Sequence, residues 1–366
     1  MNIIVDNKIP FLQDALTKYG QALYVKGDEI SADHAAQADV LLVRTRTCCN
    51  AGLLENSAVK FIGTTTIGTD HIDLDYCRRK GIVVANAAGC NAPAVMQHVI
   101  TALLTLAVKK KVALQSLTLG IVGVGNVGKR VAAAAKALGM TALLNDPPRE
   151  MREGSAQFTP LHELLHRSDV VTLHLPLQHD THNFADVSFF RALKEGAWFI
   201  NTSRGEVVNE KDLVQYANKL DALALDVWRS EPHFDVNLLK YATIATPHIA
   251  GYSLQGKRKA SQMVLEALAQ WCDDTDPIPE LIDHTSPPPV IVPEGATVQE
   301  QLYAAVQKTY PIMEMDAQMR QHPADFEALR NNYPLRNDFT AHTVASADNP
   351  ALSEILKILG FRVSKA

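Results

Sequence analysis

The sequence contains few cysteines and no C-x-x-C pair. Its five cysteines are an odd number spread over 366 residues. Neither a disulfide framework nor a metal site is therefore expected, and the predicted compartment is the reducing cytoplasm. Basic residues are not in excess, because 35 Lys and Arg stand against 40 Asp and Glu, giving a formal net charge of −5. Duplex nucleic-acid binders usually carry a basic excess that displaces counterions from phosphates, so no nucleic-acid partner is expected.

Long hydrophobic runs are absent as well. The longest, Val99 to Val108, contains two Thr and is about half as long as a bilayer-spanning helix. The amino-terminal segment reaches Asp6 after three apolar residues, which is not typical of a secretory signal. With 47% hydrophobic and 20% charged residues, we expect a soluble protein of more than one domain, without a membrane partner.

Two series of short apolar runs alternate with helix-length segments. Near-continuous apolar strands of this kind predict parallel sheets that are covered by helices on both faces. In the first series we predict strands at 3–5, 22–25, 40–43, 61–63 and 82–84. In the second we predict strands at 119–122, 142–144, 170–173, 198–200, 223–225 and 243–245. The expected fold class is α/β, with two doubly wound parallel-sheet domains.

A proline run at 287–289 predicts a stiff linker before the last part of the chain. Beyond it we predict helices at 298–310 and 351–359 and strands at 342–345 and 361–363, enough for a small α+β domain. The expected domains are one doubly wound domain (1–92 and 253–285), a second doubly wound domain (93–252) and a carboxyl-terminal domain (286–366). Because the last carries no catalytic motif, we expect it to mediate association, with a homodimer as the default.

A G-x-G-x-x-G motif directly follows the first strand of the second series. Its residues are Gly123, Val124, Gly125, Asn126, Val127 and Gly128. The first glycine permits a tight turn, the second lets the backbone approach a pyrophosphate, and the third lets the following helix pack on the strand. Asp146 ends the next strand, where a carboxylate accepts hydrogen bonds from ribose hydroxyls and repels a 2′-phosphate. Although an Asp before two prolines is also common in turns, the combination predicts NAD rather than NADP.

Three chemically useful side chains follow later strands of the same series, namely Arg204, Glu231 and His248. Ligands of open α/β sheets lie at the carboxyl ends of the strands. There a histidine can take a hydroxyl proton, a carboxylate can stabilise the resulting imidazolium, and an arginine can hold a substrate carboxylate. Each of the three is more often structural when it occurs alone. Together, behind a dinucleotide-binding motif, they favour catalysis on a 2-hydroxy or 2-oxo acid.

These motifs, in this order, resemble the NAD-dependent D-2-hydroxyacid dehydrogenase family. The resemblance rests on the glycine motif, Asn201 to Val208, Asp226-Val227-Trp228 with Glu231-Pro232, and Pro247 to Gly251. Further stretches resemble a branch of the family that acts on a small phosphorylated 2-hydroxy acid. They are Val43-Arg44-Thr45, Gly68 to His71, Gly89 to Ala92, His248 to Tyr252, Phe326, and Leu329-Arg330-Asn331-Asn332-Tyr333. The resemblance therefore extends over essentially the whole chain.

The resemblance implies that residues 1–92 and 253–285 form a flavodoxin-like substrate-binding domain and that residues 93–252 form an NAD-binding Rossmann domain. It also implies a role for particular residues. Arg204 would orient the substrate, Glu231 would partner the histidine, and His248 would act as acid and base. The implied contacts to NAD beyond the glycine motif are Asp146, Leu175, Thr202, Ser203, Arg204, Asp226 and Gly251. The implied contacts to substrate are Thr45, Thr66 and Tyr252.

Two alternatives to this hypothesis stay open on the sequence. Another dehydrogenase of the family, such as one acting on 3-phosphoglycerate, would need a different carboxyl-terminal domain. An NAD-sensing, corepressor-like binding protein could retain Arg204, Glu231 and His248 and would differ from an enzyme only in lacking turnover.

Overall fold

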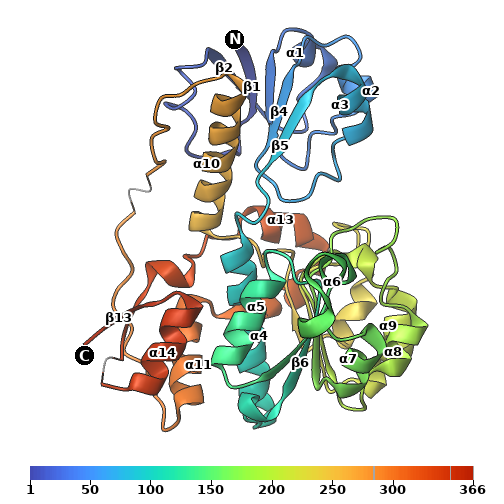
Figure 1. Cartoon of the computed structure of the whole chain (residues 1–366), viewed down its shortest axis with the longest axis vertical. Coiled ribbons are helices and arrows are strands. Elements are labelled where there is room, and N and C mark those ends of the chain that lie inside the picture. Colours follow the sequence, from blue (N-terminus) through green and yellow to red (C-terminus); the bar gives the residue numbers. More distant parts are fainter. Residues whose placement is uncertain (283–284, 347, 366) are drawn as a thin grey trace. The chain divides into compact units, whose positions relative to one another are not determined.

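The structure is a computed structural model that describes residues 1–282, 285–346 and 348–365. The chain forms two compact units, each built from two separate stretches of sequence. The first unit contains Met1–Asn91 and Ser253–Ser286, and the second contains Ala92–Tyr252 and Pro287–Ala366. Figure 1 shows a central sheet flanked by helices in each unit.

The first unit contains a five-stranded sheet in the order β2-β1-β3-β4-β5. All of its pairings are parallel, and this strand order is that of flavodoxin-like folds. The strands are β1 (Asn2–Asp6), β2 (Gln21–Val25), β3 (Val40–Val43), β4 (Phe61–Thr64) and β5 (Val83–Asn86). Each coincides with a predicted apolar run, so the flavodoxin-like architecture is confirmed.

Helices bury both faces of this sheet. The short helices α1 (Ala32–Ala36), α2 (Ala51–Leu54) and α3 (Leu74–Lys80) lie along the chain between the strands. The long helix α10 (Leu254–Trp271), which occupies the predicted range, returns to the other face. There its Val264 and Leu268 pack in one core with Phe61 of β4.

The second unit contains a six-stranded sheet in the order β11-β10-β9-β8-β6-β7. All of its pairings are parallel, as the sequence predicts. Its strands are β6 (Thr118–Val122), β7 (Thr141–Asn145), β8 (Val170–Leu173), β9 (Trp198–Asn201), β10 (Ala222–Leu225) and β11 (Ile244–Ala245). The helices of this part of the chain are α4 (Ala92–Lys110), α5 (Gly128–Ala137), α6 (Pro147–Glu153), α7 (Leu161–Arg167), α8 (Val187–Ala192) and α9 (Glu210–Tyr216). The Rossmann-type architecture is confirmed.

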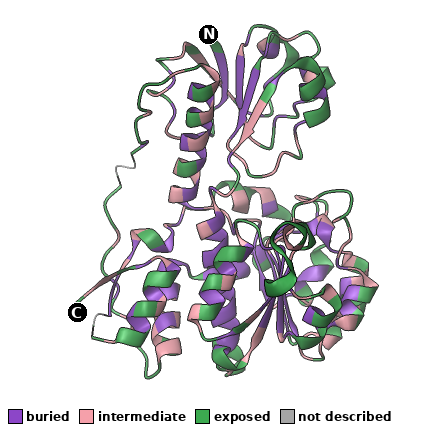
Figure 2. Ribbon diagram, in the orientation of Figure 1, coloured by how far each residue is buried: buried purple, intermediate pink, exposed green. Residues whose placement is uncertain are grey.

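Helix α4 is the central core helix of the second unit. By length and composition Ala92–Lys110 could cross a membrane, but 83% of its most apolar window is buried inside the protein. Figure 2 shows it as a largely buried helix. Its apolar character is therefore accounted for by packing within the fold.

The carboxyl-terminal segment packs against α4, α5 and β11 of the second unit. Its elements are α11 (Val298–Thr309), α12 (Ile312–Gln321), α13 (Phe326–Asn331), β12 (Thr343–Ala345), α14 (Pro350–Leu359) and β13 (Arg362–Ser364). Both strands, α11 and α14 match the prediction, whereas α12 and α13 were not predicted. Val306 and Leu356 share a core with Leu103 of α4. The segment that the sequence sets apart at residue 286 therefore shares a hydrophobic core with the Rossmann-type fold.

Candidate active site

The three candidate catalytic side chains follow three neighbouring strands of the second sheet. Arg204 comes after β9, Glu231 after β10 and His248 after β11, and these strands are adjacent in the sheet. Because parallel strands end at the same edge, the loops that carry the three residues extend from one edge of the sheet.

His248 and Glu231 form a hydrogen-bonded pair. The imidazole Nδ1 lies 2.7 Å from Glu231 Oε2, and the two side chains are only 24% and 15% exposed. The other carboxylate oxygen, Oε1, accepts the backbone N–H of Trp228 at 2.9 Å. The carboxylate is thus fixed by the backbone and in turn fixes the ring. With Nδ1 engaged, Nε2 is the nitrogen that can exchange a proton with a substrate.

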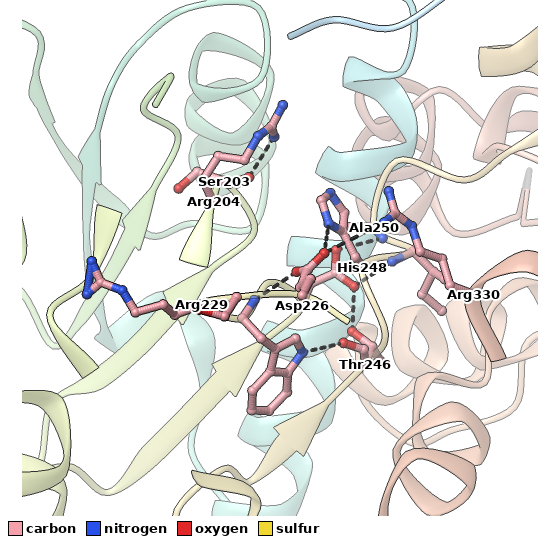
Figure 3. Close-up of polar contacts among 12 residues, drawn as sticks. Ser203, Arg204, Asp226, Arg229, Thr246, His248, Ala250 and Arg330 are labelled. Atoms are coloured by element: carbon pink, nitrogen blue, oxygen red, sulfur yellow. Dashed lines mark hydrogen bonds and ion pairs between the residues drawn. The ribbon is translucent and has the colours of Figure 1, made fainter. Parts of the chain in front are cut away.

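Asp226 anchors the loop that carries His248. It is 1% exposed, and its Oδ1 accepts the Thr246 hydroxyl at 2.7 Å and the Ile249 N–H at 2.8 Å. Its Oδ2 accepts the Ala250 N–H at 2.9 Å. Figure 3 shows these contacts beneath the imidazole. This anchoring role is not evident from the sequence, where the resemblance implies for Asp226 only a contact to NAD.

Arg204 lies on a turn that buried polar contacts hold in place. Asn201, which is 1% exposed, accepts the N–H and hydroxyl of Ser203 and donates to the Arg204 carbonyl at 3.0 Å. The Arg204 guanidinium donates to the Ser203 carbonyl at 2.8 Å. Figure 3 shows Arg204 across from His248, whereas the guanidinium of Arg229 points away from both. The sequence indicates Asn201 only as part of a motif, yet Asn201 sets the shape of this turn.

The glycine motif has the geometry that a dinucleotide requires. Gly123 has φ +86°, and a Cβ there would lie 2.5 Å from the His174 carbonyl oxygen. A Cβ on Gly128 would lie 2.0 Å from the Gly123 carbonyl oxygen, whereas one on Gly125 would meet nothing within 4 Å. The first and third glycines are therefore required by the turn and the helix packing, while the second leaves open space for a ligand.

A buried, unpartnered hydroxyl on the neighbouring turn also fits a bound cofactor. Thr202 Oγ1 is buried and has no hydrogen-bond partner among the described residues, which is unusual for a polar atom in a folded protein. Leu175, another implied contact, is half-buried two residues after β8. Together with the glycine turn, these features fit NAD. Among the described residues, no group of three or more His, Cys, Asp or Glu side chains could hold a metal ion.

Asp146 lies beside the glycine turn and caps α6. Its Oδ2 accepts the Val124 N–H at 2.7 Å, and its Oδ1 accepts the Arg149 N–H at 3.0 Å. The Arg149 guanidinium donates to the Val124 carbonyl at 2.6 Å and forms two hydrogen bonds with Glu153. Sequence reasoning missed Arg149. Its position three residues after the acidic residue was the available signal, since a nearby arginine is what accommodates a 2′-phosphate.

Three further residues are implied as substrate contacts by the resemblance. In the first unit Thr45 is exposed, and the Thr66 hydroxyl donates to the Gly68 carbonyl at 2.8 Å and lies 2.7 Å from the Thr64 hydroxyl. In the second unit the Tyr252 hydroxyl accepts a hydrogen bond from Arg330 Nε at 3.0 Å. Gly251, an implied NAD contact, directly precedes Tyr252 and is half-buried.

Comparison with known proteins agrees with this fold. Residues 104–250 match the family model "D-isomer specific 2-hydroxyacid dehydrogenase, NAD binding domain", and residues 286–360 match a domain of unknown function (DUF3410). A solved D-lactate dehydrogenase from Aquifex aeolicus, complexed with NAD and lactic acid, is 29% identical, with a TM-score of 0.64 over 75% of this chain and 96% of that chain. The fold and the site thus define the class of D-isomer specific 2-hydroxyacid dehydrogenases with an NAD-binding domain.

Curated relatives narrow this class further. An erythronate-4-phosphate dehydrogenase from Bacteroides fragilis is 41% identical over 353 residues, which cover 94% of this chain and 99% of the relative. One from Escherichia coli is 39% identical over 373 residues, covering 99% of this chain and 98% of the relative. The chain belongs to the family of the erythronate-4-phosphate dehydrogenases.

Proposed function

We propose that the chain oxidises 4-phospho-D-erythronate to 2-oxo-3-hydroxy-4-phosphobutanoate with NAD, a step of pyridoxal phosphate biosynthesis. The observation that carries the reaction type is the 2.7 Å hydrogen bond between His248 and Glu231, on loops that follow neighbouring strands of an NAD-binding fold. The choice of substrate is supported by the near full-length similarity to erythronate-4-phosphate dehydrogenases.

The side chains have complementary tasks in this reaction. Neutral His248 takes the proton of the C2 hydroxyl through Nε2, and Glu231 stabilises the imidazolium that forms. Arg204 holds the substrate carboxylate through paired charge-assisted hydrogen bonds, which orients C2. NAD, when bound, supplies the hydride acceptor.

Further residues would hold the cofactor and the substrate. The proposed NAD contacts are Gly123, Gly125, Asn126, Val127, Gly128, Asp146, Leu175, Thr202, Ser203, Arg204, Asp226 and Gly251. The proposed substrate contacts are Thr45, Thr66 and Tyr252. The unpartnered Thr202 hydroxyl and the open space at Gly125 support the NAD assignment.

The direct test is NADH formation with a panel of 2-hydroxy acids. We expect 4-phospho-D-erythronate to give a kcat/KM well above that of 3-phosphoglycerate and D-lactate. A preference for 3-phosphoglycerate would instead assign the chain to another activity of the class. NAD binding without turnover of any compound would contradict the enzyme and favour an NAD sensor.

We also propose that residues 286–366 form a dimerisation domain and that the enzyme is a cytoplasmic homodimer. Large apolar side chains of this segment are exposed, with Val290 at 55%, Val292 at 59% and Ile358 at 48%, and an interface would cover such side chains. Sedimentation should give about twice the 40.1 kDa of one chain. A 40.1 kDa species at micromolar concentration would contradict the dimer.

A further inference from the structure

Arg330, a residue of the carboxyl-terminal segment, reaches the acid–base pair. It lies on α13, and its Nη1 is 3.7 Å from Glu231 Oε2, the same oxygen that lies 2.7 Å from His248 Nδ1. Its Nε donates to the Tyr252 hydroxyl at 3.0 Å. The side chain is 26% exposed, so water screens this pair only in part. Figure 3 shows Arg330 beside the loop that carries His248.

Buried contacts fix α13 in this position. Phe326, also on α13, is 1% exposed, and its ring centroid lies 5.4 Å from that of Phe234. The ring centroid of Phe234 in turn lies 4.8 Å from that of Trp228, whose backbone N–H donates a hydrogen bond to Glu231. The segment that delivers the Arg330 cation is thus packed on the same loop that carries the carboxylate.

A second arginine of the segment, Arg336, holds the other side of the His248 loop. Arg336 is 7% exposed, and its guanidinium donates to the carbonyl oxygens of Ile249, Ala250 and Ala94. It also lies over the Tyr310 ring, 4.2 Å from the centroid. Arg336 is therefore engaged by backbone carbonyl groups, whereas Arg330 faces the Glu231 carboxylate.

The other ionisable groups around the loop do not duplicate this contact. Asp226 is engaged by the hydroxyl of Thr246 and two backbone N–H groups. His98 lies 3.0 Å from the Tyr310 hydroxyl, and burial lowers the pKa of His98 to about 4, so it carries no charge at neutral pH. The Tyr333 hydroxyl accepts from Arg336 at 3.4 Å. Arg330 is thus the cation that pairs with Glu231 in this part of the structure.

We propose that Arg330 is a positioning residue of the dehydrogenase reaction, which shares Glu231 with His248 and fixes the Tyr252 hydroxyl. This inference rests on the proposed function. A cation beside a carboxylate reduces the stabilisation that the carboxylate gives to a neighbouring imidazolium. Arg330 therefore offsets part of the negative charge that Glu231 presents to His248, the group proposed to accept the substrate proton. The carboxyl-terminal segment takes part in the active site in addition to any role in association.

The test compares Arg330→Gln and Arg330→Lys with the unmodified enzyme. Without the cation, His248 takes up a proton at higher pH, so the acidic limb of the kcat/KM profile for oxidation should move up by about 1 pH unit. Arg330→Lys, which keeps the charge, should restore most of the original profile. Glu231→Gln should move the limb in the opposite direction. The control is Arg362→Gln, since Arg362 is an exposed arginine of the same segment that donates to the Ala341 carbonyl.

A second readout does not depend on turnover. The imidazole NMR signals of His248, assigned by comparison with His248→Gln, should titrate at higher pH in Arg330→Gln than in the unmodified protein. If this shift is present but 4-phospho-D-erythronate is not oxidised, the proposed function fails and the positioning role stands. If Arg330→Gln does not fold, Arg330→Met and Arg330→Lys provide the same comparison.

Two results would overturn the proposal. One is an unchanged acidic limb and an unchanged His248 titration in a folded Arg330→Gln protein. The other is a rise in KM alone, without movement of the pH profile, which would make Arg330 a substrate contact rather than a positioning residue.

Discussion

Asp146 is the residue that decides between the two nicotinamide cofactors. Its carboxylate faces the glycine turn through the Val124 N–H, and Arg149 lies against the same turn through the Val124 carbonyl. A 2′-phosphate beside the carboxylate is repelled, while an arginine attracts it. Asp146→Ala should therefore raise the kcat/KM ratio of NADP to NAD by at least about tenfold. Steady-state kinetics with both cofactors measure the change.

The same substitution also destabilises the protein, and a control must separate this loss of stability from the change in cofactor preference. Asp146 is the N-cap of α6, and its loss should destabilise the protein by about 1 kcal/mol. Asp235→Ala removes an N-cap from another helical segment and should leave the cofactor ratio unchanged. Equal efficiency with NAD and NADP in the unmodified enzyme would contradict the role of Asp146.

The sequence predicts the site residues that follow strands better than the site residues that a distant segment contributes through tertiary packing. Arg204, Glu231 and His248 each follow an apolar run, and parallel strands bring their ends to one edge. Arg330 and Arg336 carry no such signal, because their contacts depend on how a distant segment packs against the sheet. Arg330 lies within the motif Leu329 to Tyr333 and Arg336 lies close to it. This motif indicates the family but not the contacts that the two arginines make.

At the scale of elements, helix-start signals separate the two predicted helices of the carboxyl-terminal segment from the two that were not predicted there. Helix α11 begins with a capping box of Thr297 and Glu300, and α14 has an Asn349 cap and ends at left-handed Gly360. In contrast, α12 and α13 have no side-chain cap, and α13 is only six residues long. Helices without such signals are stabilised chiefly by tertiary packing, which a single sequence does not display.

Helix α12 is also tied to the strand that precedes His248. Asp316 is 5% exposed and accepts the Ala245 N–H of β11 at 2.8 Å. It also pairs with Arg320, which donates to the carbonyls of Leu239 and Ala242. Removing the carboxylate leaves a buried N–H and a partly buried cation unsatisfied. Asp316→Ala should therefore lower the free energy of unfolding by about 1–3 kcal/mol.

Urea unfolding measures this change, and Asp325→Ala provides the control because Asp325 is 65% exposed in a long 4.0 Å contact with His322. The control should alter the midpoint little. A midpoint for Asp316→Ala equal to that of Asp325→Ala would show that α12 does not support β11.

At the scale of the whole molecule, the carboxyl-terminal segment completes the core of the NAD-binding unit. Leu302, Val306 and Leu356 are at most 1% exposed and share a core with α4. Deleting residues 287–366 would expose α4, most of which is apolar. We expect the shortened chain to aggregate or to lose cooperative unfolding, as measured by circular dichroism and light scattering. A soluble, cooperatively folded product that binds NAD would contradict this account.

The most direct test of the central claim is the oxidation of 4-phospho-D-erythronate by His248→Gln beside the unmodified enzyme, with NAD affinity measured on both. His248 is hydrogen-bonded to Glu231 and is assigned as the group that takes the hydroxyl proton. Its loss should lower kcat by about 10²–10⁴-fold while NAD affinity is retained. A near-normal kcat with intact NAD binding would show that another group is the base.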